Sequence, residues 1–67
     1  MLNMEDFGRR LAELRRQPGL KQREIAEHIG VSVQAVSKWE RGLSCPDILV
    51  LDELSSVLGV TISELFH

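Results

Sequence analysis

The chain has 67 residues, of which 43% are hydrophobic and 27% charged, and a formal net charge of −2 at pH 7. This composition is too apolar for a disordered tail, and the length suits one small domain. The longest apolar run, residues 48–51, is far shorter than the roughly 20 residues of a membrane span, and no signal-peptide pattern is present, so we expect a cytoplasmic protein. A lone Cys45 and two histidines exclude an internal disulfide and a Cys/His zinc site, and no metal or other cofactor is expected.

Apolar residues at helical spacing predict a first helix over residues 4–16. Phe7, Leu11 and Leu14 are four and three residues apart, and Asn3 precedes them as a candidate N-cap. No stretch alternates apolar and polar residues as a half-buried strand would. The expected fold class is therefore all-α, a compact bundle of five short helices.

The next two predicted helices, residues 22–29 and 33–41, are joined by a very short turn. Small and apolar residues stand where two closely crossing helices need them, and a glycine at the break allows a positive φ. These positions are Ile25, Ala26, Ile29, Gly30, Val31, Val36 and Trp39. Ser32 is the expected start of the second of these helices, and Trp39 is expected to pack it onto the fourth. Such a pair is typical of proteins that place one helix in a DNA groove.

Two more helices are predicted after the third. Asp47 is a candidate N-cap for a helix over residues 47–58. The inward face of this helix is predicted to consist of Ile48, Leu51, Leu54, Ser55 and Leu58. Thr61 and Glu64 form a capping box in front of a last short helix over residues 62–66.

Charge is segregated along the chain. Residues 8–23 contain six basic side chains against Glu13, a net charge of +5, whereas residues 47–67 contain four acidic side chains and no Lys or Arg, a net charge of −4. Because Lys and Arg supply most non-specific affinity for nucleic acids, the N-terminal excess favours a nucleic-acid partner despite the negative total. The alternative is chance, since solvated helix faces are often charged.

Five short motifs occur in order: Leu14-Arg15 before a Gly-Leu, Gln22-x-x-Ile25-Ala26, Gly30-Val31-Ser32, Val36 to Gly42, and Leu58-Gly59-Val60. Through them the stretch from about Phe7 to Phe66 resembles the helix-turn-helix family of phage Cro and repressor proteins, the xenobiotic-response-element type. The resemblance implies a single lambda repressor-like DNA-binding domain over residues 1–67, with residues 33–41 as its recognition helix. It also implies a transcriptional regulator, taken to be a repressor, that binds a palindromic double-stranded DNA operator as a homodimer. Neither a membrane nor a small-molecule ligand is an expected partner.

The sequence departs from this family at two positions. Lys21 stands where the family usually has the Ser or Thr that caps the second helix, which predicts a weaker cap but offers a phosphate contact. Asp52 stands where the fourth helix more often has an apolar residue or proline, which leaves the burial of this position open.

The expected base contacts are side chains that point away from the packing face of the recognition helix: Val33, Gln34, Ser37 and Lys38. Phosphate contacts are expected from Lys21, Gln22, Arg23 and Arg41. Among these, Gln22 matches the glutamine that holds the DNA backbone in the resembling family. Ordinary solvated residues are the alternative at each position. The same resemblance implies a structural ion pair between Arg15 and Glu40.

Three apolar residues are not used by the expected packing of the five helices: Leu43, Leu49 and Val57. They are either simply exposed, which is common, or part of a dimer patch. Such a patch would set two recognition helices about 34 Å apart, one turn of DNA.

An enzyme is not expected. The sequence shows no nucleophile with a base, no paired carboxylates and no phosphate-binding glycine loop, and the chain is too short to enclose a substrate. The main alternative to DNA binding is a protein-interaction module, such as an antitoxin or adaptor with the same fold. The basic stretch and the polar recognition positions favour DNA, whereas the net acidity and the apolar Leu43 and Leu49 favour the alternative.

Overall fold

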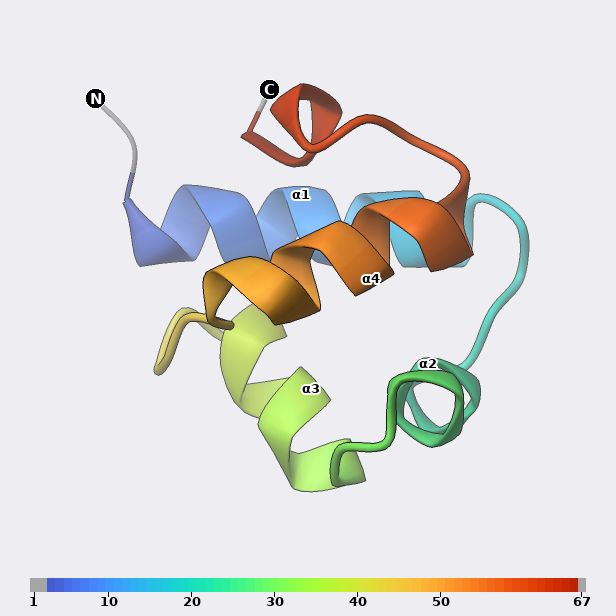
Figure 1. Ribbon diagram of the computed structural model, residues 1–67. Coiled ribbons are helices and arrows are strands. Elements are labelled where there is room, and N and C mark those ends of the chain that lie inside the picture. Colours follow the sequence, from blue (N-terminus) through green and yellow to red (C-terminus); the bar gives the residue numbers. More distant parts are fainter. Residues whose placement is uncertain (1–2, 67) are drawn as a thin grey trace.

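The computed structural model describes residues 3–66, which form four α-helices and a final 3-10 helix (Figure 1). These elements are α1 (Met4–Arg16), α2 (Gln22–Ile29), α3 (Val33–Glu40), α4 (Ile48–Leu58) and η1 (Ser63–Phe66). No strand occurs among residues 3–66, so the prediction of an all-helical fold is confirmed. In the same part of the chain, no helix is both long and apolar enough to cross a membrane.

The prediction of a fifth α-helix is wrong, because η1 is a single turn of 3-10 helix. Its backbone hydrogen bonds join residues three apart, from the Glu64 N–H to the Thr61 carbonyl at 3.1 Å and from the Leu65 N–H to the Ile62 carbonyl at 3.0 Å. Four residues are too few to build a row of i to i−4 bonds, and short turns commonly adopt this tighter form. The predicted capping box is present: the Thr61 N–H donates to Glu64 Oε1 at 3.0 Å, and the Glu64 N–H donates to Thr61 Oγ1 at 3.1 Å.

Three of the four α-helices begin with a side-chain cap. The side-chain oxygens of Asn3, Ser32 and Asp47 accept hydrogen bonds from the backbone N–H three residues later, at 2.8, 3.1 and 2.9 Å respectively. Lys21 has no side-chain oxygen to do the same for α2, although its own N–H donates to Glu24 Oε1 at 2.8 Å. The first N–H groups of α2 therefore begin without a cap from Lys21.

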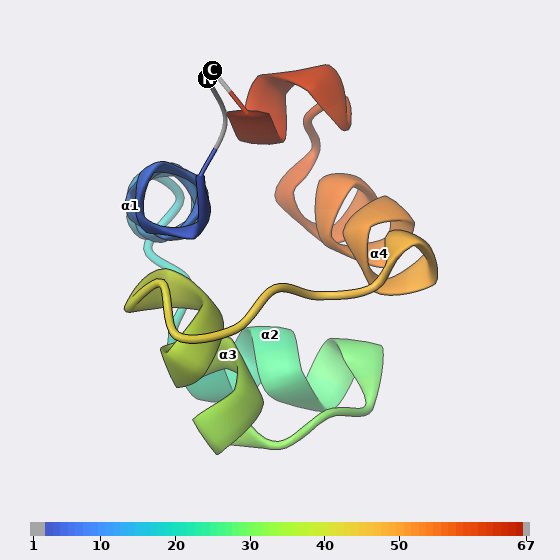
Figure 2. The ribbon, with the colours of Figure 1, turned by 90° about the vertical axis from the view of Figure 1, so that its left-hand side faces the viewer.

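The helices surround one core to which every element contributes. In both views α2 and α3 lie together on one side of the molecule and η1 on the opposite side, while Figure 2 shows α1 and α4 facing each other across the space between. The most deeply buried large side chains are one from each element: Leu11, Ile25, Val36, Leu54 and Leu65. Trp39 is buried as predicted, but α3 packs mainly on α1 and α2 rather than on α4.

One residue predicted for the inner face of α4 lies on the surface. Ile48 is 76% exposed, whereas Leu54 and Ser55 are buried and Leu51 and Leu58 are half-buried. Ile48 is the first residue of α4, and helical side chains lean toward the N-terminus, so its side chain leans back past the start of the helix and away from the core.

Gly8 permits a close approach between α1 and α3 that the sequence analysis missed. A Cβ atom at this position would lie 2.3 Å from the carbonyl oxygen of Trp39 and 2.6 Å from that of Glu40. Both distances are shorter than any ordinary contact, so only glycine allows the end of α3 to rest directly on α1. The available signal was a lone glycine within a helical pattern, which usually has a packing reason.

Candidate nucleic-acid interface

The turn between α2 and α3 sets the direction in which α3 leaves the core. Gly30 has a φ of 84°, in the left-handed region that the sequence predicted for it. The N–H groups of Gly30 and Val31 both donate to the carbonyl of Ala26, at 2.8 and 3.0 Å. Ala26 is itself buried, which leaves room for a methyl group where the two helices cross. Three residues thus separate the helices, and α3 begins at the Ser32 cap.

Helix α3 has one buried and one exposed face. Val36 and Trp39 are buried in the core, whereas Val33, Gln34 and Lys38 are exposed; we call these three residues the reading face. The eight residues of α3 span about 12 Å at 1.5 Å per residue, similar to the width of the DNA major groove. The outward side of α3 therefore presents an amide, an ammonium group and an apolar side chain.

Ser37 and Arg41, predicted separately as a base contact and a phosphate contact, are bonded to each other. Arg41 Nε donates to the Ser37 hydroxyl oxygen at 3.2 Å and to the Ser37 carbonyl oxygen at 3.3 Å. Arg41 follows the last residue of α3, so its guanidinium folds back over the end of that helix. The Ser37 hydroxyl accepts this bond and still has its own hydrogen to donate.

Three elements meet at the carboxylate of Glu40, the last residue of α3. Arg15 donates from Nε to Glu40 Oε2 at 2.6 Å and from Nη2 to Oε1 at 3.0 Å, and the two side chains are only 11% and 6% exposed. Gln22, the first residue of α2, donates from Nε2 to Oε1 at 2.9 Å. Arg15 Nη1 also donates to the carbonyl of Leu20 at 2.8 Å. We call Arg15, Gln22 and Glu40 the carboxylate network.

The network contains the ion pair that the family resemblance implied, together with a bond from Gln22 that the sequence did not suggest. The hydrogen bond with Glu40 raises the pKa of Arg15, burial opposes this effect, and the negative charge of Glu40 adds to it. Both oxygens of Glu40 are held by the planar guanidinium, which matches a carboxylate in geometry. The position of Gln22 is thereby linked to both α1 and α3.

Half of the basic side chains in residues 8–23 are bound to acceptors within the fold: Arg9, Arg10 and Arg15. Their respective acceptors are the Asp6 carboxylate, the Glu64 carbonyl and the Glu40 carboxylate. The other half are exposed and have no hydrogen-bond acceptor among residues 3–66: Arg16, Lys21 and Arg23. Two of these, Lys21 and Arg23, flank Gln22 at the start of α2.

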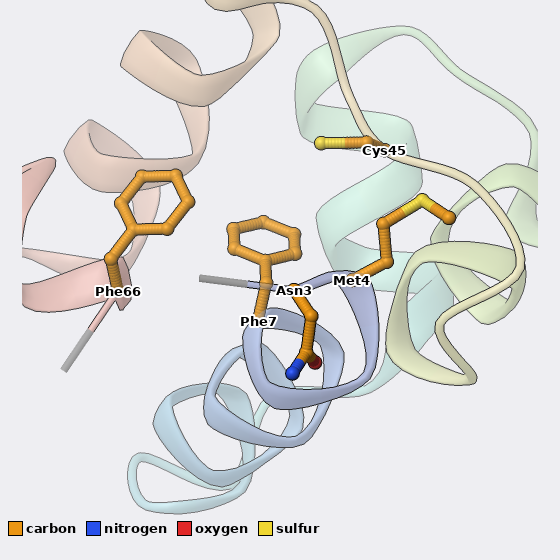
Figure 3. Close-up of a pocket in the computed structure, with 5 residues that line it drawn as sticks. All are labelled: Asn3, Met4, Phe7, Cys45 and Phe66. Carbon is orange, nitrogen blue, oxygen red and sulfur yellow. The ribbon is translucent and has the colours of Figure 1, made fainter. Parts of the chain in front are cut away.

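An apolar hollow of about 190 Å³ lies at the N-terminal end of α1 (Figure 3). It is lined by Asn3, Met4, Phe7, Cys45 and Phe66. The rings of Phe7 and Phe66 face each other with their centroids 5.2 Å apart. None of the lining residues is charged, and the NH₂ group of Asn3 already donates to the Asp6 carboxylate at 3.1 Å. The hollow therefore offers no cationic group to a phosphate.

A separate set of apolar side chains is exposed at the start of α4 and in the loop before it. Leu43, Ile48 and Leu49 are 61%, 76% and 74% exposed. We call these three residues the apolar patch. Val57, which the sequence analysis grouped with Leu43 and Leu49, is half-buried and packs against the core. Ile48 was assigned to the core instead, although its place directly after the Asp47 cap was a signal that it lies at the helix end.

These features define a helix-turn-helix domain with a polar, partly cationic outer face. A family model described as helix-turn-helix matches residues 11–65. The chain therefore belongs to the helix-turn-helix family of the Cro and repressor type.

Known relatives of this chain are transcriptional regulators. The HTH-type transcriptional regulator PuuR of Escherichia coli (strain K12) is 42% identical over 59 residues, which cover 88% of this chain and 32% of PuuR. The chain thus spans about a third of the length of that relative.

Solved structures of similar sequence share the whole fold. The restriction-modification controller protein C.AhdI from Aeromonas hydrophila has a TM-score of 0.89 and 33% identity, covering 94% of this chain and 96% of its own. The biofilm master regulator SinR, solved in complex with DNA, has a TM-score of 0.83 and 34% identity, covering 91% of this chain and 98% of its own.

Proposed function

We propose that this chain binds double-stranded DNA sequence-specifically as the DNA-binding domain of a transcriptional regulator, with α3 in the major groove. The observation that carries this proposal is the exposed reading face of α3, a helix whose last residue, Glu40, is bonded to Gln22 at the cationic start of α2. The solved complex of SinR with DNA supports it, since that chain is similar to this one over nearly its full length.

The reading face suits direct recognition of base edges. Gln34 has the amide needed for a bidentate contact with adenine, Lys38 can donate to guanine O6 and N7, and Val33 can contact a thymine methyl group. Ser37 keeps one hydroxyl hydrogen to donate, because its bond with Arg41 uses only its oxygen. We assign all four side chains to base contacts on this basis.

Phosphate contacts are assigned to the start of α2 and the end of α3. Lys21 and Arg23 are exposed cations, and the N–H groups of the first turn of α2 carry the partial positive charge of a helix N-terminus. Gln22 lies between the two cations and Arg41 lies at the end of α3. These contacts position the domain on DNA without reading its sequence.

Selection of bound duplexes from random oligonucleotides tests the proposal. Recovery of one enriched palindrome is the expected result, whereas binding without any enriched sequence would contradict a sequence-specific regulator. With the selected site, Gln34→Ala should relax the preference at one base position by about 1–3 kcal/mol. A uniform loss of affinity on every site variant would remove Gln34 from the reading face.

Charge variants separate phosphate contacts from general attraction. Lys21→Ala should weaken binding to all duplexes alike and reduce the salt slope by about one. Arg16→Ala is the matched control, because Arg16 is also an exposed cation but belongs to α1 and is assigned no DNA contact. Equal effects of the two substitutions would contradict the assignment of Lys21.

We further propose that two copies associate through the apolar patch and bind the two halves of a palindrome. The domain measures 30 × 22 × 22 Å, so two half-sites about 34 Å apart, one turn of DNA, lie within reach of two copies in contact. Light scattering should detect a dimer at the concentrations at which DNA binding saturates. A monomer under those conditions would contradict a preformed dimer.

A further inference from the structure

We propose that Glu40 is a positioning residue for DNA binding, which acts by holding the carboxamide of Gln22 against the start of α2. This inference rests on the proposed function, in which Gln22 contacts a DNA phosphate. It goes further by assigning a binding role to a carboxylate that carries the wrong charge to contact DNA itself.

The geometry makes Glu40 a firm anchor for Gln22. Arg15 engages both carboxylate oxygens, at 2.6 and 3.0 Å, and Glu40 is 6% exposed, so the acceptor of the Gln22 bond cannot turn into solvent. The Gln22 amide nitrogen lies 2.9 Å from Oε1 of this held carboxylate. A glutamine on a helix surface normally samples many rotamers, and this bond restricts it before any ligand is present.

The carboxamide of Gln22 can donate a second hydrogen bond to DNA while it donates the first to Glu40. The NH₂ group of glutamine has two hydrogens, and its bond to Glu40 uses one of them. The second hydrogen is directed away from Glu40 and is available to a phosphate oxygen. No acceptor among residues 3–66 takes the backbone N–H of Gln22 or of Arg23, so these groups are available to the same phosphate.

Arg15 has a second task in this arrangement. A bare carboxylate next to the DNA backbone would repel the phosphates, whereas the charge of Glu40 is balanced by the guanidinium bonded to it. The carboxylate network therefore supplies a strong hydrogen-bond acceptor for Gln22 with little net charge at the interface.

The direction in which Glu40→Gln changes the affinity for DNA distinguishes a positioning role from a purely electrostatic one. If Glu40 acted only as a nearby negative charge, Glu40→Gln would tighten DNA binding. If it positions Gln22, the same change should weaken binding about fivefold, because the one remaining oxygen is kept by the charged Arg15 and the new NH₂ group, a donor, faces the NH₂ donor of Gln22. Glu53→Gln removes an equal charge from an exposed site on α4 and should leave the affinity within about twofold.

A double-mutant cycle tests whether the effect passes through Gln22. The probe is a mixed-sequence 20-base-pair duplex at low salt, because phosphate contacts do not depend on sequence, and affinity is measured by fluorescence anisotropy. Gln22→Met should weaken binding about fivefold, and Glu40→Gln should have no further effect in that background. Urea unfolding of each variant gives its folded fraction, and each affinity is calculated from the concentration of folded protein.

The outcomes distinguish this inference from the function on which it rests. Absence of any duplex binding by the wild-type chain overturns both. Wild-type binding combined with additive effects in the cycle, or with tighter binding by Glu40→Gln, overturns the positioning role and leaves DNA binding intact.

A measurement on the free wild-type protein covers the case in which Glu40→Gln does not fold. One side-chain N–H of Gln22 should exchange with solvent more slowly than those of Gln34, an exposed glutamine in the same spectrum. Equal exchange of the two side chains would show that Gln22 is not held before DNA arrives, and would overturn the inference.

Discussion

The part of the molecule formed by α1, α2 and α3 and the part formed by α4 and η1 are held in different ways. In the first, a buried carboxylate binds side chains from two other helices, and Gly8 lets the backbones of α1 and α3 touch. In the second, α4 and η1 attach mainly through Leu54 and Leu65, and the one directional contact of η1 with α1 in the described part of the chain is an exposed hydrogen bond from Arg10 to the Glu64 carbonyl. The helices that present the proposed DNA contacts are therefore the ones joined by buried directional contacts.

The difference matches what each part is proposed to do. Base recognition requires α3 to keep its angle and register to within a fraction of an ångström, and hydrogen bonds with fixed geometry supply this better than apolar contacts. Association with a second copy requires exposed apolar surface, which the start of α4 provides through the apolar patch. Substitutions in the two parts should consequently affect different properties.

The largest effect is expected from Arg15→Ala in the first part. It leaves Glu40 buried without its counter-charge, which should lower the free energy of unfolding by about 3–5 kcal/mol. Urea denaturation followed by circular dichroism measures this loss. Arg9→Ala is the control, because the Arg9–Asp6 pair is exposed and should contribute less than about 1 kcal/mol. Equal stabilities of Arg15→Ala and the wild type would show that the carboxylate network does not hold the first part together.

Gly8→Ala should destabilise the same part by about 1–3 kcal/mol. Helix propensity alone predicts the opposite sign, since alanine in a helix is favoured over glycine by about 1 kcal/mol. The steric clash outweighs the gain in helix propensity, because the atoms 2.3 and 2.6 Å from the added Cβ are backbone carbonyl oxygens, which cannot move without shifting α3. Glu13→Ala, at an exposed position of α1, serves as a control for helix propensity. A Gly8→Ala variant more stable than the wild type would contradict the close approach.

Features that depend on nearby residues were predictable from the sequence. The caps at Asn3, Ser32 and Asp47 and the left-handed turn at Gly30 each involve groups within four residues of each other, so a short motif is enough to indicate them. The burial of Val36 and Trp39 follows from the spacing of apolar residues. Those positions also define the outward face of α3, from which the candidate base contacts were chosen.

Features that depend on how distant segments meet were not predictable. The partners of the Gln22–Glu40 bond are 18 residues apart, and the bond depends on the crossing angle of α2 and α3. The approach at Gly8 depends equally on tertiary packing. Ile48 was wrongly assigned to the inner face of α4 because apolar periodicity takes no account of where a helix ends. The first residue of a helix can extend beyond the elements that would cover it.

In the second part, Ile48→Ser should alter association rather than folding. Ile48 is 76% exposed in the single chain, so its loss should change the free energy of unfolding by no more than about 0.5 kcal/mol. Burial of this side chain between two copies would make the dimer dissociate about tenfold more readily in the variant. Sedimentation equilibrium measures the dissociation constant, with Ile62→Ser as a control outside the apolar patch. An unchanged dissociation constant would place the dimer contact elsewhere.

The smallest effect is expected at η1, where the stability of the second part depends on pH. The backbone N–H of Thr61, and then its hydroxyl, donate to the carboxylate of Glu64 and hold its pKa below the ordinary value of 4.5. Because the folded state favours the ionised form, this stabilisation is fully present above pH 4.5 and is lost as the pH falls through the lower value in the folded protein.

Glu64→Gln keeps an oxygen for the Thr61 N–H but removes the charge, so it should be less stable than the wild type at pH 7, and the difference should shrink below pH 4.5. Urea unfolding at several pH values measures the difference, and Glu53→Gln controls for the loss of one acidic group. The effect is small because the carboxylate is solvent-exposed. Affinity for DNA should not change, since η1 lies on the side of the molecule opposite α2 and α3 (Figure 2). A loss of affinity in Glu64→Gln would mean that the second part of the molecule also controls the geometry of the first.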